Sequence, residues 1–169
     1  MQYQPFFVVG LDRPGSIICI CDHASNIIPK FWGSEGLGIS KSEMNRHIAF
    51  DLGAKDLTLK LAKLLESPAV VSNFSRLVID PNRGVDDPTL IMKLYDGTII
   101  PKNKVINKEE EKRRLNDYYD PYHNAIEETV SSIKTPIVIS IHSFTPKLKN
   151  GKKRPWEIGI LHTKDPVSY

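Results

Sequence analysis

The sequence predicts an α/β fold in three layers, built on a mixed, largely parallel β-sheet. Two observations predict this class. Short apolar runs, typical of strands buried on both faces, alternate along the chain with longer segments of helical periodicity. The composition, 40% hydrophobic and 25% charged, is that of a globular domain and excludes disordered, collagenous and coiled-coil proteins. At 169 residues the chain fits one domain, residues 1–169.

The first predicted strand covers residues 17–21, an uninterrupted apolar run that contains both cysteines of the chain. Cys19 and Cys21 are two apart on one strand, a spacing that does not favour a disulfide, so we expect free thiols and a reducing compartment, the cytoplasm. No apolar run approaches the roughly 20 residues of a membrane-spanning helix, so we expect no membrane contact.

The first predicted helix covers about residues 41–66. Ser40 and Glu43 have the spacing of a capping box, in which each side chain bonds a free amide at the helix start. The helix is expected to end before Pro68, because the residue preceding a proline disfavours helical backbone.

The second predicted helix covers about residues 108–132. Asn107 is suited to cap its first turn. Pro121 has no amide hydrogen to donate, so we expect a kink or a restart there, with Asp120 as the new cap.

The remaining predicted strands are apolar runs that are separated by turn-forming residues, at 69–71, 77–79, 137–141 and 156–161. Residues 81–106 are rich in Pro and Gly and are expected to form a long irregular stretch. Connections of that length are usually functional loops or disordered segments.

Polar clusters accompany three of these strands, at residues 21–26, 75–83 and 140–146. Ligand sites in open α/β sheets gather at the carboxyl ends of strands, so three such clusters indicate a constructed site.

His23 and His142 each follow an apolar strand, and neutral imidazole nitrogens are suited to bind a divalent metal. A third ligand is unresolved, with Asp22 or Asn26 as candidates. The alternative is that both histidines are capping or surface residues.

Arg76, Asn82 and Arg83 are suited to recognise an anion, because a guanidinium group matches the geometry of a carboxylate. The alternative is a set of structural ion pairs, Arg76 with Asp80 and Arg83 with the acids that follow it. His47 and Asp51, four apart on the first predicted helix, form either a pair that serves a site or a surface pair.

The segment 147–154 is basic, through Lys147, Lys149, Lys152, Lys153 and Arg154, and Asn150-Gly151 predicts a tight turn in it. We interpret this segment as a solvated turn rather than a phosphate or nucleic acid site, because no aromatic ladder or recognition helix accompanies it.

Several motifs appear in a recognisable order: Cys21-Asp22-His23-Ala24-Ser25-Asn26, Arg46-His47-Ile48-Ala49-Phe50-Asp51-Leu52-Gly53-Ala54, Ser75-Arg76-Leu77-Val78-Ile79-Asp80-Pro81-Asn82-Arg83, Pro121-Tyr122-His123, Ile141-His142-Ser143-Phe144-Thr145-Pro146 and Arg154-Pro155-Trp156-Glu157-Ile158-Gly159-Ile160-Leu161. Together they resemble the N-formylglutamate amidohydrolase family over about residues 15–166.

The resemblance implies hydrolysis of a small acidic N-acyl amino acid, with N-formyl-L-glutamate giving formate and glutamate in histidine breakdown. It implies a phosphorylase/hydrolase-like fold related to zinc-dependent exopeptidases and aspartoacylase-like amidohydrolases, with Zn²⁺ or another divalent metal as cofactor. Carried onto this chain, the metal ligands are His23 and His142, the catalytic residues are His142 and Arg76, and the substrate-binding residues are Arg76, Asn82 and Arg83.

Full-length members of the family continue beyond the segment that matches residues 156–161, so this chain is expected to lack the family's C-terminal segment. Two functions stay open. One is an amidohydrolase, and the other is a shortened, non-catalytic member that binds an acidic small molecule or partner. A homo-oligomer is compatible with both.

Overall fold

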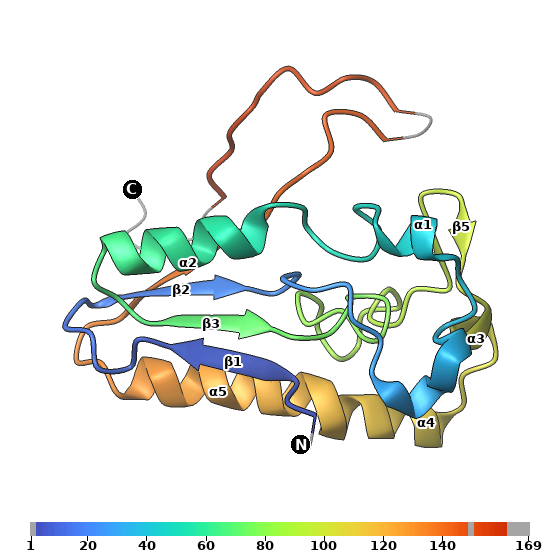
Figure 1. Cartoon of the computed structure of the whole chain (residues 1–169), viewed down its shortest axis with the longest axis horizontal. Coiled ribbons are helices and arrows are strands. Elements are labelled where there is room, and N and C mark those ends of the chain that lie inside the picture. The colour runs from blue at the N-terminus through green and yellow to red at the C-terminus, as the bar shows by residue number, and fades with distance from the viewer. Residues whose placement is uncertain (1–2, 149–150, 162–169) are drawn as a thin grey trace.

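The main sheet consists of four strands, β1 (Phe6–Val9), β2 (Ile17–Cys21), β3 (Ala69–Ser72) and β6 (Ile137–Ser140). They are ordered β1-β3-β2-β6 in a computed structural model that describes residues 3–148 and 151–161. Strand β2 runs parallel to β3 and β6, and β1 is antiparallel to β3. Helix α2 (Ala54–Leu64) covers one face and α5 (Asp120–Ser131) the other (Figure 1). The predicted three-layer, mixed and largely parallel α/β fold is confirmed.

The register of the parallel strands brings their carboxyl ends to one edge of the sheet. Cys21 pairs with Val71 of β3, and Ile20 pairs with Ser140 of β6. The segments that follow β2, β3 and β6 therefore start next to one another, as expected for a site built at strand ends.

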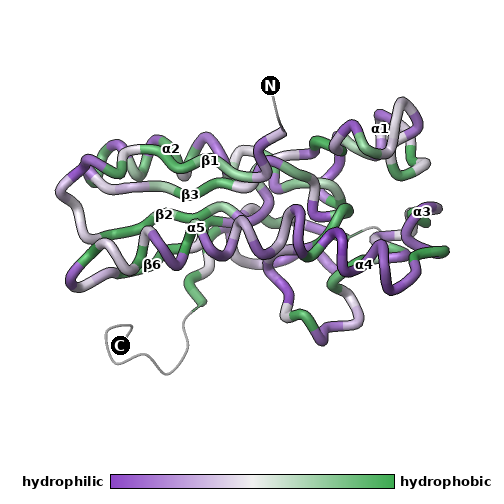
Figure 2. The backbone as a smooth tube through the Cα atoms, turned by 90° about the horizontal axis from the view of Figure 1, so that it is seen from below, coloured by the Kyte–Doolittle hydropathy of each residue, from purple (hydrophilic) through white to green (hydrophobic). Residues whose placement is uncertain are grey.

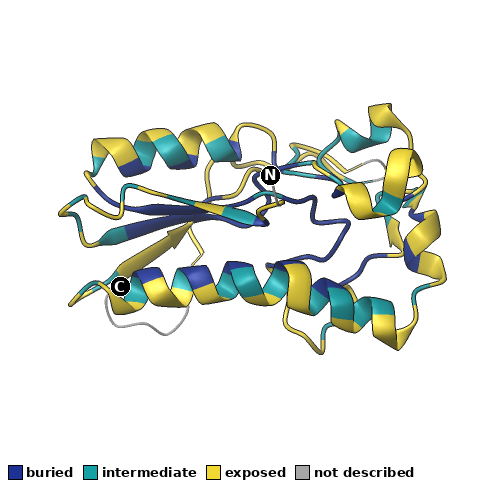
Figure 3. Cartoon of the chain, turned by 60° about the horizontal axis from the view of Figure 1, so that its bottom comes forward, coloured by how far each residue is buried: buried dark blue, intermediate teal, exposed yellow. Residues whose placement is uncertain are grey.

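The hydrophobic core lies between the sheet and the two helices. Apolar segments run along the strands (Figure 2), and the centre of β2 and β3 is fully buried, whereas β6 is exposed at the edge of the sheet (Figure 3). Cys19 and Cys21 are buried free thiols, as predicted. Among the described helices, none is both long enough and apolar enough to cross a bilayer.

The helix predicted over residues 41–66 is divided in two, so that prediction was wrong in its middle. Ser40 caps the short helix α1 (Lys41–Met44), accepting the Glu43 amide at 3.2 Å as predicted. A 3-10 segment, η1 (Lys30–Glu35), lies before it. The chain then leaves the helical path until Gly53, which begins α2 with a φ of 79° that favours glycine. The interruption carries Asp51, which is buried.

The strand predicted at residues 77–79 was also wrong, although these residues are fully buried. Side chains replace a neighbouring strand here. Asn103 Nδ2 donates to the Leu77 carbonyl at 2.8 Å, and Arg114 Nη1 donates to the Val78 carbonyl at 2.7 Å. Backbone groups can therefore be buried without a sheet partner when polar side chains satisfy them.

The long stretch over residues 81–106 is more ordered than predicted. It contains a small hairpin, β4 (Leu94–Tyr95) with β5 (Thr98–Ile99), followed by helix α3 (Pro101–Lys104). The strand predicted at residues 156–161 is not formed. Lys149 and Asn150 lie outside the described residues, and the predicted Asn150-Gly151 turn falls on one of them.

The second predicted helix is present as α4 (Lys108–Arg114), a π-helical turn η2 (Leu115–Tyr119) and α5. Asn107 caps α4 as predicted, accepting the Glu110 amide at 2.8 Å. The predicted restart at Asp120 was wrong: Asp120 is helical, and its amide donates to the Leu115 carbonyl five residues back. The helix therefore continues through this region by a wider, π-helical turn and does not break.

Candidate metal centre

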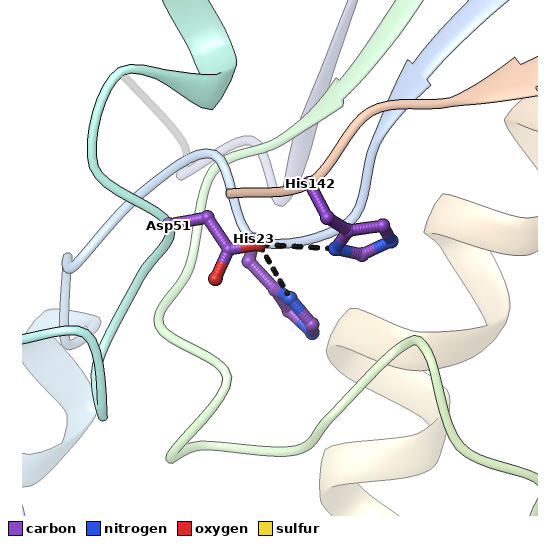
Figure 4. A group of neighbouring side chains, drawn as sticks. All are labelled: His23, Asp51 and His142. Atoms are coloured by element: carbon purple, nitrogen blue, oxygen red, sulfur yellow. Dashed lines mark hydrogen bonds and ion pairs between the residues drawn. The ribbon is translucent and has the colours of Figure 1, made fainter. Parts of the chain in front are cut away.

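Two histidines face one carboxylate at the carboxyl edge of the sheet (Figure 4). His23 follows β2, His142 follows β6, and Asp51 comes from the interruption between α1 and α2. The Oδ2 atom of Asp51 lies 3.4 Å from His23 Nδ1 and 3.0 Å from His142 Nδ1. The two imidazole rings meet edge to face, with centroids 4.9 Å apart.

Each histidine has a second carboxylate on its outer side. His23 Nε2 lies 2.7 Å from Asp80 Oδ1, and His142 Nε2 lies 3.1 Å from Asp22 Oδ2. In a neutral imidazole, a carboxylate that accepts the Nε2 proton leaves the Nδ1 lone pair on the side of Asp51, where a metal could take it. A protonated imidazole instead donates to carboxylates through both nitrogens.

Asp22 is held by hydrogen-bond donors from two other elements. Tyr122 of α5 donates its hydroxyl to Oδ1 at 2.9 Å, and Ser140 at the end of β6 donates to Oδ2 at 2.8 Å. A hydrogen-bonded outer carboxylate keeps the histidine that it contacts in one orientation.

Asp80 and Asp51 share one cation. Arg76 Nη2 lies 2.8 Å from Asp80 Oδ2, and Nη1 lies 3.5 Å from Asp51 Oδ1. The Asn82 amide adds a bond to Asp80 Oδ1 at 3.0 Å. All three carboxylates of the site are at least nine-tenths buried, so their charges require these partners.

The mutual contacts shift the pKa values of the site in opposite directions. Burial favours the neutral form of His142, but its bonds to Asp22 and Asp51 outweigh burial and raise its pKa to about 9. Burial also opposes the charge on Asp51, yet the bonds with His142 and His23 hold the pKa of that carboxyl below its usual value. The site therefore favours ionised carboxylates beside cationic groups.

The group His23, Asp51 and His142 could hold a metal ion, since one donor atom from each lies within 4.8 Å of the others. The Asp51 Oδ2 to imidazole distances of 3.4 and 3.0 Å are close to the separation of about 3.3 Å between ligands of a tetrahedral zinc ion. The outer contacts to Asp80 and Asp22 are those that metal-binding histidines make. The residues therefore fit a divalent metal.

The structure brings His23 and His142 together, and the third residue of the group that could hold a metal is Asp51 rather than Asp22 or Asn26. Asp51 lies between them. Asp22 contacts the outer nitrogen of His142, and Asn26 donates its side-chain amide to the Met44 carbonyl at 2.9 Å. The sequence singled out Asp51 only as a partner of His47, because its distance in the sequence from His23 and His142 conceals its contact with them.

The predicted pairing of His47 with Asp51 on one helix face was wrong, because neither residue is on a helix. His47 Nε2 instead lies 3.3 Å from Asp96 Oδ2, while Asp51 faces the two histidines.

The predicted anion-binding residues differ in how accessible their side chains are to a ligand. Arg76 is buried and paired with Asp80, which is the structural alternative that the sequence left open. The side chain of Arg83 is 44% exposed, with Asp80 and Asp87 oxygens each 3.9 Å from its guanidinium. Asn82 is exposed beside it. Of the two arginines, Arg83 is the one available to a ligand.

The fold and this group of side chains define an α/β protein with a candidate metal centre at the carboxyl ends of its strands. The sequence matches the N-formylglutamate amidohydrolase family over residues 15–168, and the chain belongs to that family. A search of curated proteins found no match.

Two solved structures are similar to this chain. A gene product of Agrobacterium tumefaciens is 32% identical with a TM-score of 0.90, and the match covers 96% of this chain and 65% of the other. The N-formylglutamate amidohydrolase from Ralstonia eutropha JMP134 is 22% identical with a TM-score of 0.64, over 83% of this chain and 57% of the other. This chain therefore spans less than two thirds of the length of either structure.

Proposed function

We propose that this protein is a metal-dependent amidohydrolase that cleaves an N-acyl amino acid such as N-formyl-L-glutamate to formate and glutamate. One observation carries the proposal: His23 and His142 face Asp51, and each has its outer nitrogen on a buried carboxylate. Membership of the family supports the reaction class.

The charges of the site suit a divalent cation. Asp22, Asp51 and Asp80 bring three negative charges, of which Arg76 and the more distant Arg83 balance at most two. Either two protonated histidines or one divalent cation with neutral histidines would supply the remaining positive charge. Two imidazoles and one carboxylate are a ligand set that zinc takes in hydrolytic enzymes.

A divalent metal at this position would polarise the acyl carbonyl and lower the pKa of a water molecule. The protein's own side chains orient the two imidazoles and anchor the substrate. Asp80 and Asp22 hold the imidazole tautomers through Nε2, and Arg76 keeps Asp80 and Asp51 ionised by its charge. Arg83 and Asn82, at the surface beside Asp80, would bind a substrate carboxylate.

The test combines elemental analysis with a formate-release assay on N-formyl-L-glutamate. We expect about one zinc ion per chain and metal-dependent formate release, both lost in His142→Ala. His47→Ala is the matched control, since it removes an imidazole outside the group and is expected to keep the metal. Formate release that survives removal of the metal, or zinc that survives His142→Ala, would contradict the proposal.

A second candidate function is binding of an acidic ligand without turnover. Among the described residues, each carboxylate that touches the two histidines already accepts bonds from its neighbours, so none is free to protonate a leaving amine. Stoichiometric zinc and ligand binding with no formate release would favour this second function.

A further inference from the structure

The π-helical turn η2 shapes the surface beside the metal centre. The Asp120 amide bonds the Leu115 carbonyl five residues back, one residue further than in an α-helix. Pro121 explains the wider turn, because it has no amide hydrogen and its ring clashes with the carbonyl four residues earlier. π-helical turns are rare in proteins, and many of those that occur lie at functional sites.

Tyr119, the last residue of this turn, and His123, four residues further along in α5, hold the segment that carries Arg83. Tyr119 donates its hydroxyl to the Arg83 carbonyl at 2.8 Å, and His123 Nε2 lies 3.0 Å from the Pro81 carbonyl. A carbonyl only accepts, so His123 Nε2 carries the proton. The two rings are in contact, with centroids 4.3 Å apart, and brace each other.

The opposite side of the same segment is attached to the metal centre. Both amides after Pro81 bond Asp80: the Asn82 amide donates to its carboxylate at 3.0 Å, and the Arg83 amide donates to its carbonyl at 3.1 Å. Asp80 in turn contacts His23 Nε2 at 2.7 Å. Residues 81–83 thus bridge helix α5 and the histidine that is proposed to bind metal.

We propose that Tyr119 and His123 are positioning residues that fix the Arg83 guanidinium at the distance from the metal centre required by the carboxylate of the substrate. This inference rests on the proposed function. The two side chains bond only the backbone of residues 81–83, so they act through Arg83 and set affinity for an acidic substrate rather than the rate of acyl cleavage.

Tyr119→Phe is the first test, because it removes one hydroxyl and keeps the ring that contacts His123. We expect the KM for N-formyl-L-glutamate to rise about threefold to tenfold, the effect of one hydrogen bond, with kcat within about twofold of the wild-type value. Tyr3→Phe is the matched control, since Tyr3 also donates its hydroxyl to a backbone carbonyl, that of Asn73. It is expected to leave KM unchanged.

A double-mutant cycle separates positioning from general loosening. In an Arg83→Ala background, Tyr119→Phe is expected to change KM by less than about twofold, since the residue it positions is absent. His123→Ala is expected to raise KM, and His123→Gln, which retains an amide donor, to restore part of it. Equal effects of Tyr119→Phe with and without Arg83, or a fall in kcat alone, would overturn the inference.

Calorimetric measurement of N-formyl-L-glutamate binding distinguishes failure of the positioning role from failure of the proposed function. If the wild-type chain binds the ligand without turnover, the proposed hydrolysis fails, and a weaker Kd in Tyr119→Phe still supports positioning. If the wild-type chain hydrolyses the ligand and Tyr119→Phe matches it in KM and Kd, only the positioning role fails. Absence of both binding and turnover overturns both proposals.

Discussion

The two histidines of the metal centre make the same kinds of contact but stand in different surroundings. Each follows a parallel strand, directs Nδ1 to Asp51 and has its Nε2 beside another aspartate. His23 follows the central strand β2 and is 1% exposed. His142 follows the edge strand β6, whose residues are all exposed, and its side chain is 31% exposed.

This difference indicates a division of work between the two sides. The His23 side, with Asp80 and Arg76, belongs to the core and must keep its charges paired for the chain to fold. The His142 side is accessible to solvent and to ligands, so its loss is expected to affect metal binding more than stability. Substitutions on each side test this comparison.

The largest effect is expected for His23→Ala. It leaves Asp80 and Asp51 buried beside a single arginine, and breaking a buried charge pair costs about 3–5 kcal/mol of unfolding free energy. Denaturant unfolding of the metal-free chain measures it. A loss no greater than that of His142→Ala under the same conditions would remove the distinction between the two sides.

The next effect is expected for Tyr122→Phe, which removes the hydroxyl that α5 donates to Asp22. A hydrogen bond to a buried charged group contributes about 2 kcal/mol, so the variant should lose about that much stability. Because Asp22 orients His142, zinc affinity should also fall, by about tenfold or more. Titration with zinc checks this, and unchanged affinity would show that Asp22 does not act through His142.

A smaller effect is expected from the protonation of His142. In the metal-free chain its pKa is raised from 6.5 to about 9, so its stabilisation is complete below pH 6.5 and is lost as the pH rises through about 9. Partial exposure limits the loss to about 1 kcal/mol. We expect unfolding in EDTA to show this loss in the wild-type chain and not in His142→Ala.

The sequence predicted the sheet and its strand-end histidines because both depend on local patterns. The apolar runs at residues 17–21 and 137–141 formed β2 and β6, and the polar residues after them met at one edge. Local patterns could not reveal the contact of Asp51 with the two histidines, since its position depends on a non-helical segment within a sequence of helical periodicity.

The strand wrongly predicted at residues 77–79 has a physical explanation of the same kind. Its apolar side chains are buried, as in a strand, but its carbonyl groups bond Asn103 and Arg114, which come from later in the chain. Only the tertiary structure shows which groups satisfy a buried backbone. The sequence therefore predicted the burial of this segment and not its conformation.

The smallest effect is expected for Glu110, which supports the buried segment 77–79 through Arg114. Glu110 bonds Arg114 at 2.9 Å, and the arginines at positions 113 and 114 outweigh burial to lower the pKa of this carboxyl. Its stabilisation is present above pH 4.5 and is lost as the pH falls through the lowered value. Glu110→Gln should therefore remove a fraction of the acid sensitivity of unfolding, about 0.5–1 kcal/mol for a largely shielded pair. Glu127→Gln, an exposed acid of α5, is the matched control. Equal acid sensitivity in both variants would mean that Arg114 keeps its bond to the Val78 carbonyl without Glu110. The buried side of the site would then depend on fewer charges than its contacts indicate.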